Sequence, residues 1–290
     1  MKRPAKFPTR PGRALHRLFG QQVDLALRHL RDPEPAQRAH SIHEARKCLK
    51  QLRALVRLLR RWLGPTASRR ENERLRQLAR ELAPERDAAA LLEALEALPR
   101  RASLRAALKQ ARLELAARLP LPKPTRRRAG PPGTRRMQQV LVRLRARLEG
   151  WGWSQLTWAD LQAGLRRTYR AGRRAFDRAR ESASTEDLHD WRKPVKFLAL
   201  QLTTLAALRI PVDTATIRAL QHIAADCGQE HDLALLADFL ARHCPHLPAG
   251  GSLLREAAQR RQKLSARALR CGRRVYNRKS DAFARRIFPA

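Results

Sequence analysis

The chain consists of stretches in which apolar residues recur every three or four positions, separated by short breaks that contain proline or glycine. In the stretch 42–61 the apolar residues form such a stripe, and cations recur at the same steps one position further on. A ladder of cations therefore runs beside the stripe. On one helix the two sets form adjacent faces, one suited to core packing and one positively charged. Cations at this spacing repel one another, so an anion along the ladder would stabilise the helix. The stripe comprises Ile42, Ala45, Leu49, Leu52, Val56 and Leu59, and the ladder comprises Arg46, Lys50, Arg53, Arg57 and Arg60.

The same spacing predicts helices along most of the chain, and no segment alternates as a β-strand does, so the predicted fold class is all-α. Ser68 with Glu71, and Thr157 with Asp160, have capping-box spacing and predict helix starts. Pro194 lies inside a predicted helix and indicates a kink or a late helix start, because proline lacks a backbone N–H. The predicted helices cover about 12–31, 36–63, 68–82, 84–98, 103–119, 135–149, 157–180, 186–208, 213–227, 229–243, 252–275 and 279–287.

Residues 120–134 contain five prolines, two glycines and a basic triplet, which is typical of a linker or an exposed loop. This segment divides a domain at 12–288 into two helical halves, 12–119 and 135–288. Residues 1–11 are basic and contain proline, and we expect them to form a flexible arm.

Three segments of the first half recur in the second half at an offset of 145 or 146 residues, and the first of them places Leu15 on Leu161 and Phe19 on Leu165. LHDWRKPVKFLALQL (188–202) aligns with IHEARKCLKQLRALV (42–56), and DCGQEHDLALLADFL (226–240) aligns with ELAPERDAAALLEAL (81–95). Core packing explains the repeated leucines, but not the repeated cluster of His, acid, Arg, Lys and Lys. We therefore predict a tandem duplication of a four-to-five-helix unit, with its halves related by a pseudo-two-fold axis.

Basic residues greatly outnumber acidic ones, with 62 Lys and Arg against 26 Asp and Glu, a formal net charge of +36. Self-repulsion at this level destabilises a compact chain, so a polyanionic partner is expected: nucleic acid, an anionic membrane or a polymeric phosphate. Most of the basic residues are arginine, whose planar fork fits phosphate oxygens. Biased codon usage is the simpler explanation for part of the arginine excess.

The chain shows no sign of secretion or of a structural metal. Its four cysteines form no CxxC pair, which favours reduced thiols over a zinc site or disulfides. The N-terminal stretch has no apolar signal core, and no run approaches the about 18 apolar residues that span a bilayer. We expect a cytoplasmic protein with no membrane partner, no metal and no cofactor.

The duplicated basic helices resemble those of CHAD domains, the conserved histidine α-helical domains. The resemblance rests on HEARKCLKQLRALVRLLR, HDWRKPVKFLALQL, the ERD and EHD segments and the tail NRKSDAFARRIF, and it covers about 12–288. It implies two four-helix bundles around a basic central channel that binds inorganic polyphosphate, with no catalysis by the domain itself. Whether such binding serves targeting to polyphosphate granules or their organisation, storage, or the scaffolding of another enzyme is left open by the sequence.

Carried over onto this sequence, the resemblance identifies polyphosphate ligands on both basic helices and on the first helix of each half. The second ladder departs from the pattern, because FLALQL follows its last lysine. We therefore expect the first half to supply more of the channel's charge. The ligands are Arg17, His43, Arg46, Lys47, Lys50, Arg53 and Arg57 in the first half, and Arg166, Arg170, His189, Arg192, Lys193 and Lys196 in the second.

Each of these signals also has a simpler explanation. A single ladder is usually a solvated surface, and a histidine at a helix start usually satisfies a cap or a neighbouring carboxylate. The acids of the ERD and EHD segments are expected to hold basic residues in place. Trp151, Trp153 and Trp158 are expected to pack in a joint between helices, although they could form a stacking platform for bases.

Two other functions stay open at the level of the sequence. Histidine–acid pairs at His43, His189 and His231 are compatible with a metal-dependent phosphohydrolase of the helical HD type, although the adjoining cations disfavour a divalent ion. Nonspecific nucleic-acid binding in vitro follows from charge alone, although no groove-reading motif is present. The oligomeric state is also left open.

Overall fold

The computed structural model describes residues 10–31, 38–82, 84–99, 101–118, 134–247 and 250–288. Over these residues it contains α-helices and short 3₁₀ turns but no β-strand, so the predicted all-α class is confirmed. The helices are α1 (Gly12–Leu30), α2 (Arg38–Leu58), α3 (Arg60–Leu63), α4 (Pro65–Glu81), α5 (Pro84–Glu96), α6 (Arg105–Arg118), α7 (Thr134–Glu149), α8 (Trp158–Ser182), α9 (Thr185–Ala207), α10 (Thr214–His243), α11 (Gly250–Val275) and α12 (Ser280–Ile287).

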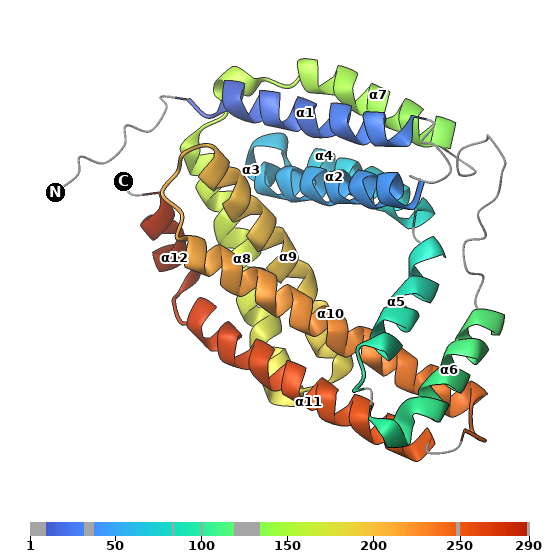
Figure 1. Ribbon diagram of the computed structural model, residues 1–290. Helices are drawn as coiled ribbons and strands as arrows, with labels where there is room; N and C mark the ends of the chain where they lie inside the picture. Colours follow the sequence, from blue (N-terminus) through green and yellow to red (C-terminus); the bar gives the residue numbers. More distant parts are fainter. Residues whose placement is uncertain are drawn as a thin grey trace.

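The helices pack in a corresponding order in the two parts of the chain. Helix α1 packs against α2 and α7, and α8 packs against α9 and α12 (Figure 1). Helix α2 packs against α4, and α9 packs against α10. The starts of α1 and α8, at Gly12 and Trp158, and those of α7 and α12, at Thr134 and Ser280, are separated by the same 146 residues as the sequence repeat. This agreement supports the duplication, which stays a prediction together with the central channel.

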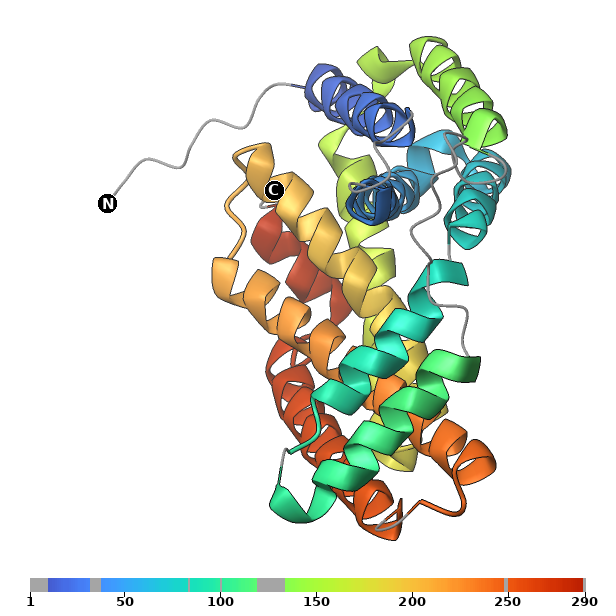
Figure 2. The same ribbon diagram turned by 45° about the vertical axis from the view of Figure 1, so that its right-hand side comes forward.

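The apolar side chains form two separate cores. The larger core joins α1, α2, α4 and α7 to α8, α9, α12 and the adjoining ends of α10 and α11, and it contains Phe19, Tyr169 and Trp191. The smaller core joins α5 and α6 to the other ends of α10 and α11 (Figure 2). Helices from both predicted halves therefore share each core. The division into 12–119 and 135–288 stays a prediction that rests on the repeat.

The two basic helices, α2 and α9, contact each other directly. Gln201 Nε2 donates to the carbonyl oxygen of Ala54 at 3.1 Å, and Gln51 Nε2 donates to Thr204 Oγ1 at 2.6 Å. Gln201 is fully buried, so this contact is stabilised by a hydrogen bond shielded from water. This contact fixes the relative rotation of α2 and α9, and therefore which face of each helix lies away from the other.

Gly164 allows α8 to approach α2 closely. A Cβ atom at this position would lie 1.9 Å from the carbonyl oxygen of Leu58, so no larger residue fits without separating the two backbones. Because Arg166 and Arg167 follow Gly164 within three residues on α8, this close approach brings them beside the end of α2.

Several predicted boundaries differ from the structure. The helix expected over 36–63 is divided at Leu59 into α2 and α3. Helix α4 begins at Pro65, which suits a first helical turn, so the capping box predicted at Ser68 and Glu71 is wrong. Ser68 Oγ instead donates to the carbonyl oxygen of Val56, and Glu71 accepts from Arg147.

The second half contains two further differences and one agreement. Helix α9 begins at Thr185, well before Pro194, so the late start is wrong, while a kink stays a prediction. Helix α10 runs through Gly228, where two helices were expected. A Cβ atom at Gly228 would lie 2.6 Å from Arg192 Nη2, so this glycine makes room for Arg192 and does not end a helix. The capping box of Thr157 is confirmed.

The predicted arm at 1–11 and the linker at 120–134 fall almost wholly outside the described residues. Of the arm, Arg10 and Pro11 are described, and Arg10 Nη1 donates to the carbonyl oxygen of Ser154 at 3.4 Å. Of the linker, Thr134 is described, and it begins α7.

Candidate functional site

The acid of each duplicated cluster forms an ion pair with a lysine of the same helix. Lys47 Nζ lies 3.0 Å from Glu44 Oε1 on α2, and Lys193 Nζ lies 2.6 Å from Asp190 Oδ1 on α9. Both lysines are exposed, and exposed pairs of this kind contribute about 0.2–1 kcal/mol. These weak pairs therefore position the lysines but do not prevent them from binding a phosphate, which could displace the acids.

The arginine of each cluster ties its helix to a later helix of the same half, α2 to α4 and α9 to α10. Arg46 donates to the carbonyl oxygen of Leu82 at the end of α4. Arg192 Nε donates to the carbonyl oxygen of Ala224 on α10 at 2.9 Å. These two predicted ligands thus have a structural role, and part of each guanidinium is engaged by protein.

The two predicted histidines lie in different surroundings. His43 is exposed on α2, whereas the ring of His189 lies against that of His231, with 4.3 Å between centroids. Burial, together with His231, Lys193 and Arg192, lowers the pKa of His189 to about 4. His189 is therefore neutral at neutral pH and supplies no positive charge to an anion.

Lysines of both basic helices line one groove. This groove of about 610 Å³ lies between α1, α2, α9 and α10, with Lys47 and Lys50 contributed by α2 and Lys196 by α9. Apolar side chains also line it, among them Leu18 of α1 and Leu55 of α2. We call it the lysine groove. It brings together three predicted ligands from the two halves.

Two further predicted ligands stack on a residue of the opposite helix. The guanidinium carbons of Arg53 and Arg57 lie 5.3 and 4.5 Å from the ring centroid of Phe197 on α9. Arg53 Nε also donates to Asn72 Oδ1 at 3.2 Å. Cation–π contacts of this kind hold an arginine in place while its N–H edge stays available. The apolar segment after Lys196 therefore supports the first ladder.

Six arginines of α3 and α8 line a second groove, also of about 610 Å³. We call it the arginine groove. It contains the predicted ligands Arg166 and Arg170. The six arginines are Arg60, Arg61, Arg166, Arg167, Arg170 and Arg174.

The stacked pair lies close enough to the arginine groove for their charges to interact. Burial, and then the charges of Arg167 and Arg60, lower the pKa of Arg57. Burial, followed by Arg57 and Arg76, lowers the pKa of Arg53. Such guanidinium groups are partly desolvated and repelled by like charges, so an anion placed among them would be strongly stabilised. We call Arg53, Arg57 and the six groove arginines the arginine track.

Acids lie at the edges of the arginine track. Asp160 Oδ1 lies 3.3 Å from Arg61 Nε, and Asp281 Oδ1 lies 2.7 Å from Arg166 Nη1. Arg17, also a predicted ligand, is exposed on α1 and lines neither groove. The structure thus brings Arg53 and Arg57 of α2 together with Arg166 and Arg170 of α8, but it does not bring Arg17 or Arg46 to them.

The family model of the CHAD domain matches residues 21–241 of the chain. The chain belongs to the CHAD domain family. No curated protein and no solved structure shows significant similarity to it. The match covers α2, α8, α9 and nearly all of α10, which carry most of the residues described above. Among the described residues, no helix of this CHAD domain is long and apolar enough to cross a bilayer.

Sequence reasoning missed part of the charged surface of this CHAD domain. The ligands expected from the sequence do not include Arg60, Arg61, Arg167 or Arg174, and the sequence assigns no role to Phe197. The sequence LRRTYRAGRR contains the signal for α8, because its arginines recur at helical spacing. Nothing in the sequence pairs Phe197 with Arg57, since that contact depends on how α2 and α9 cross.

Glu230 of the EHD segment holds a basic residue, as the simpler explanation of these acids predicts. Glu230 is buried and accepts from Arg261 Nε and Thr185 Oγ1, each at 3.0 Å. Across the described residues, no group of three or more His, Cys, Asp or Glu side chains is placed to hold a metal ion. The side chains of Glu85 and Asp87 in the ERD segment lie outside the described residues.

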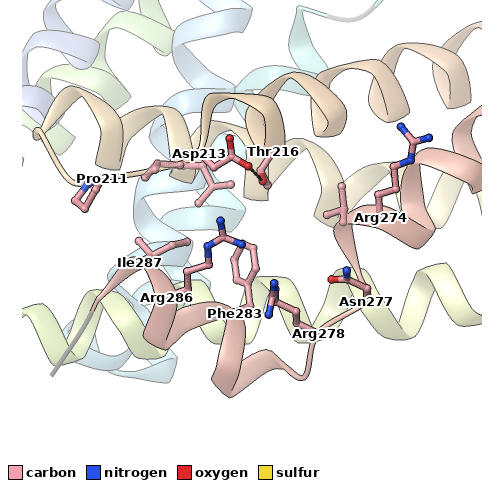
Figure 3. Close-up of a pocket in the computed structure, with 12 residues that line it drawn as sticks. Pro211, Asp213, Thr216, Arg274, Asn277, Arg278, Phe283, Arg286 and Ile287 are labelled. Carbon is pink, nitrogen blue, oxygen red and sulfur yellow. Dashed lines mark hydrogen bonds between the residues drawn. The ribbon is translucent and has the colours of Figure 1, made fainter. Parts of the chain in front are cut away.

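A third cavity, of about 390 Å³, lies between α10, α11 and α12 (Figure 3). Arg274, Arg278 and Arg286 line it, but so does Asp213, which accepts from Thr216 Oγ1 at 2.8 Å and lies close to Arg286. None of the predicted ligands lines this cavity. We therefore place the candidate site at the arginine track and the adjoining lysines.

Proposed function

We propose that this CHAD domain binds inorganic polyphosphate along the arginine track and the lysines of the two basic helices. The observation that carries the proposal is the convergence of eight arginines from α2, α3 and α8 on one surface, several of them partly desolvated by burial and by each other. Polyphosphate carries a charge on every unit and no bases, so it suits a surface rich in guanidinium groups and poor in stacking side chains.

We also propose that binding proceeds without hydrolysis of the polymer. The acids of the duplicated cluster, Glu44 and Asp190, are paired with lysines, and the surrounding cations would repel a divalent metal ion. Phosphate release should therefore stay at background when Mg²⁺ or Mn²⁺ is titrated. Steady metal-dependent release would make the protein a phosphohydrolase of the kind that the histidine–acid pairs suggest.

The binding proposal is tested by calorimetric titration with long-chain polyphosphate, and by competition at equal phosphate concentration. We expect affinity that falls steeply with salt, because binding releases counterions. We expect DNA and RNA to displace the polymer weakly at about 0.15 M salt. If either nucleic acid displaces polyphosphate as well as unlabelled polyphosphate does, the surface is a general polyanion site. Localisation to cytoplasmic polyphosphate granules is part of this proposal.

A further inference from the structure

The cavity between α10, α11 and α12 gathers charged side chains that lie outside the proposed polymer site. Arg274 of α11, Arg278 of the segment after it and Arg286 of α12 line the cavity. Among the described lining residues, Asp213, which caps α10, is the acid. In Figure 3, Arg278 and Arg286 extend towards the start of α10, where Asp213 and Thr216 lie. Three cations against one carboxylate leave a positive charge that suits an anion.

The guanidinium groups of this cavity are available to a ligand. Within the part of the chain that the structure describes, the side chains of Arg274, Arg278 and Arg286 form no hydrogen bond or ion pair. By contrast, Arg166 of the arginine groove is already paired with Asp281. Each guanidinium presents several N–H donors in a planar fork. An anion that enters the cavity therefore displaces water from these donors and breaks no ion pair of theirs.

The wall that carries Arg278 is held in place by α8. Tyr169 Oη donates to the carbonyl oxygens of Val275, at 2.9 Å, and of Arg278, at 3.1 Å. Arg173 Nη1 donates to the same Arg278 oxygen at 3.1 Å. The ring of Phe283, which lines the cavity, stacks on that of Tyr169 with 4.0 Å between centroids. The cavity is therefore preformed, which lowers the entropic cost of binding a ligand.

The sequence repeat retains the apolar residues of α12 but not the charged residues of the cavity. Buried apolar residues of α12 align, at the offset of 146, with buried apolar residues of α7. These pairs are Phe283 with Met137 and Ile287 with Leu141. Arg286, however, aligns with Val140, and Asp213 aligns with Ala67. Helix packing explains the retained positions, whereas the charged residues are particular to the second half and are not required by the shared packing.

The other wall of the cavity is apolar. Leu202, Pro211, Val212 and Ile287 contribute to it. The volume of about 390 Å³ falls within the range of about 300–1,000 Å³ that is usual for small-molecule sites. A polymer with a charge on every unit gains nothing from this wall and is repelled by Asp213. The cavity suits a small molecule that has an anionic group at one end and an uncharged body.

We propose that this cavity binds a small phosphate ester, which is a phosphate group on a hydroxylated organic body. Arg278 and Arg286 hold the phosphate, whose charge of about −1.5 to −2 at neutral pH matches the excess of cations. The Asp213 carboxylate accepts from hydroxyl groups of the body, which rests against Val212 and Ile287. Nucleotides and sugar phosphates share this chemistry. The proposal is independent of polyphosphate binding, because none of the proposed polymer ligands lines the cavity.

Calorimetric titration with three ligands tests the proposal. They are adenosine 5′-monophosphate, glucose 6-phosphate and orthophosphate. Arg278→Gln with Arg286→Gln removes two cations from the cavity. Lys279→Gln with Arg285→Gln is the matched control, since these neighbours lie outside the cavity and the loss of charge is the same. All four side chains are exposed, so both double variants should keep the fold, which thermal unfolding checks.

We expect the wild type and the control to bind one or both esters at least about tenfold more tightly than orthophosphate. The cavity variant should lose at least about tenfold in affinity for the ester. Preference for the adenosine ester identifies a nucleotide site, and preference for the glucose ester identifies a sugar phosphate site. The proposal is overturned if neither ester binds at millimolar concentration, if orthophosphate binds as tightly, or if the two double variants lose ester affinity equally.

A polyphosphate titration separates this site from the polymer site. Both double variants should bind polyphosphate equally, because they carry the same charge. Weaker polyphosphate binding by the cavity variant than by the control would assign the cavity to the polymer and overturn the proposal. If the wild type binds an ester but fails to bind polyphosphate, the proposed function fails and the ester site stands.

Discussion

Arg57 receives its environment from three helices. It belongs to α2, its guanidinium lies over Phe197 of α9, and the nearby charge of Arg167 comes from α8. In the sequence, Arg57 is one of several cations at helical spacing, and nothing distinguishes it from the others. The structure distinguishes it, because it is stacked and partly desolvated, whereas Lys47 is exposed and paired.

Replacing Phe197 by leucine should weaken polyphosphate binding by about threefold while changing stability little. Leucine preserves most of the apolar volume, but it removes the ring that holds Arg53 and Arg57, a loss of about 0.5–1 kcal/mol. Calorimetric titration with polyphosphate and thermal unfolding give the two quantities. An unchanged affinity would show that the ring does not position the arginines for the polymer.

His189 should make the protein less stable in mild acid. Its pKa is about 4 in the folded protein against the ordinary 6.5, so as pH falls through this range the unfolded chain takes up a proton that the folded chain does not. Stability is therefore lost as pH falls from about 6.5 towards 4. In His189→Gln, the unfolding free energy should fall less between about pH 7 and pH 5 than in the wild type. Equal falls would mean that His189 is not buried as described.

The close crossing of α2 and α8 is the feature that assembles the arginine track. Gly164 permits it, and Gln201 and Gln51 fix the neighbouring contact between α2 and α9. Helical periodicity predicted where these helices lie because it is a local property. It could not predict their crossing, which depends on a glycine whose role becomes visible only when Leu58 is placed beside it.

Gly164→Ala should destabilise the protein by about 1–3 kcal/mol, because the added Cβ would overlap the carbonyl of Leu58 and force the helices apart. Gly150→Ala is the control, since its Cβ would meet only Arg147 O, at 3.6 Å. Urea unfolding measures both. A Gly164→Ala protein as stable as the control would contradict the close approach of α2 and α8.

The two basic helices should contribute unequally to polymer binding. Lys50→Glu with Arg53→Glu should weaken it more than Lys193→Glu with Lys196→Glu, because Arg53 belongs to the arginine track and Lys193 is exposed beside Asp190. The charge change is the same in both double variants. Equal losses in a polyphosphate titration would show that the two halves contribute alike.

At the level of the whole molecule, the net charge of +36 is unevenly distributed between related surfaces. The sequence predicted the helical class, the repeat and the ladders, all of which are periodic features. It did not predict that α5 and α6 share a core with α10 and α11, because apolar residues do not indicate which helix they will face. Nor did the sequence separate the arginine track from the lysine groove. Which groove Arg167 and Ala199 line depends on how the helices pack.

The central claim is that polyphosphate binds along the arginine track and not simply to a positively charged protein. Two double variants with the same change in charge test it: Arg57→Gln with Arg167→Gln on the track, and Thr203→Glu with Gln21→Glu at the positions related to them by the repeat. Calorimetric titration with long-chain polyphosphate should show affinity reduced by about tenfold or more in the first and much less in the second. Equal reductions in the two variants would contradict the account.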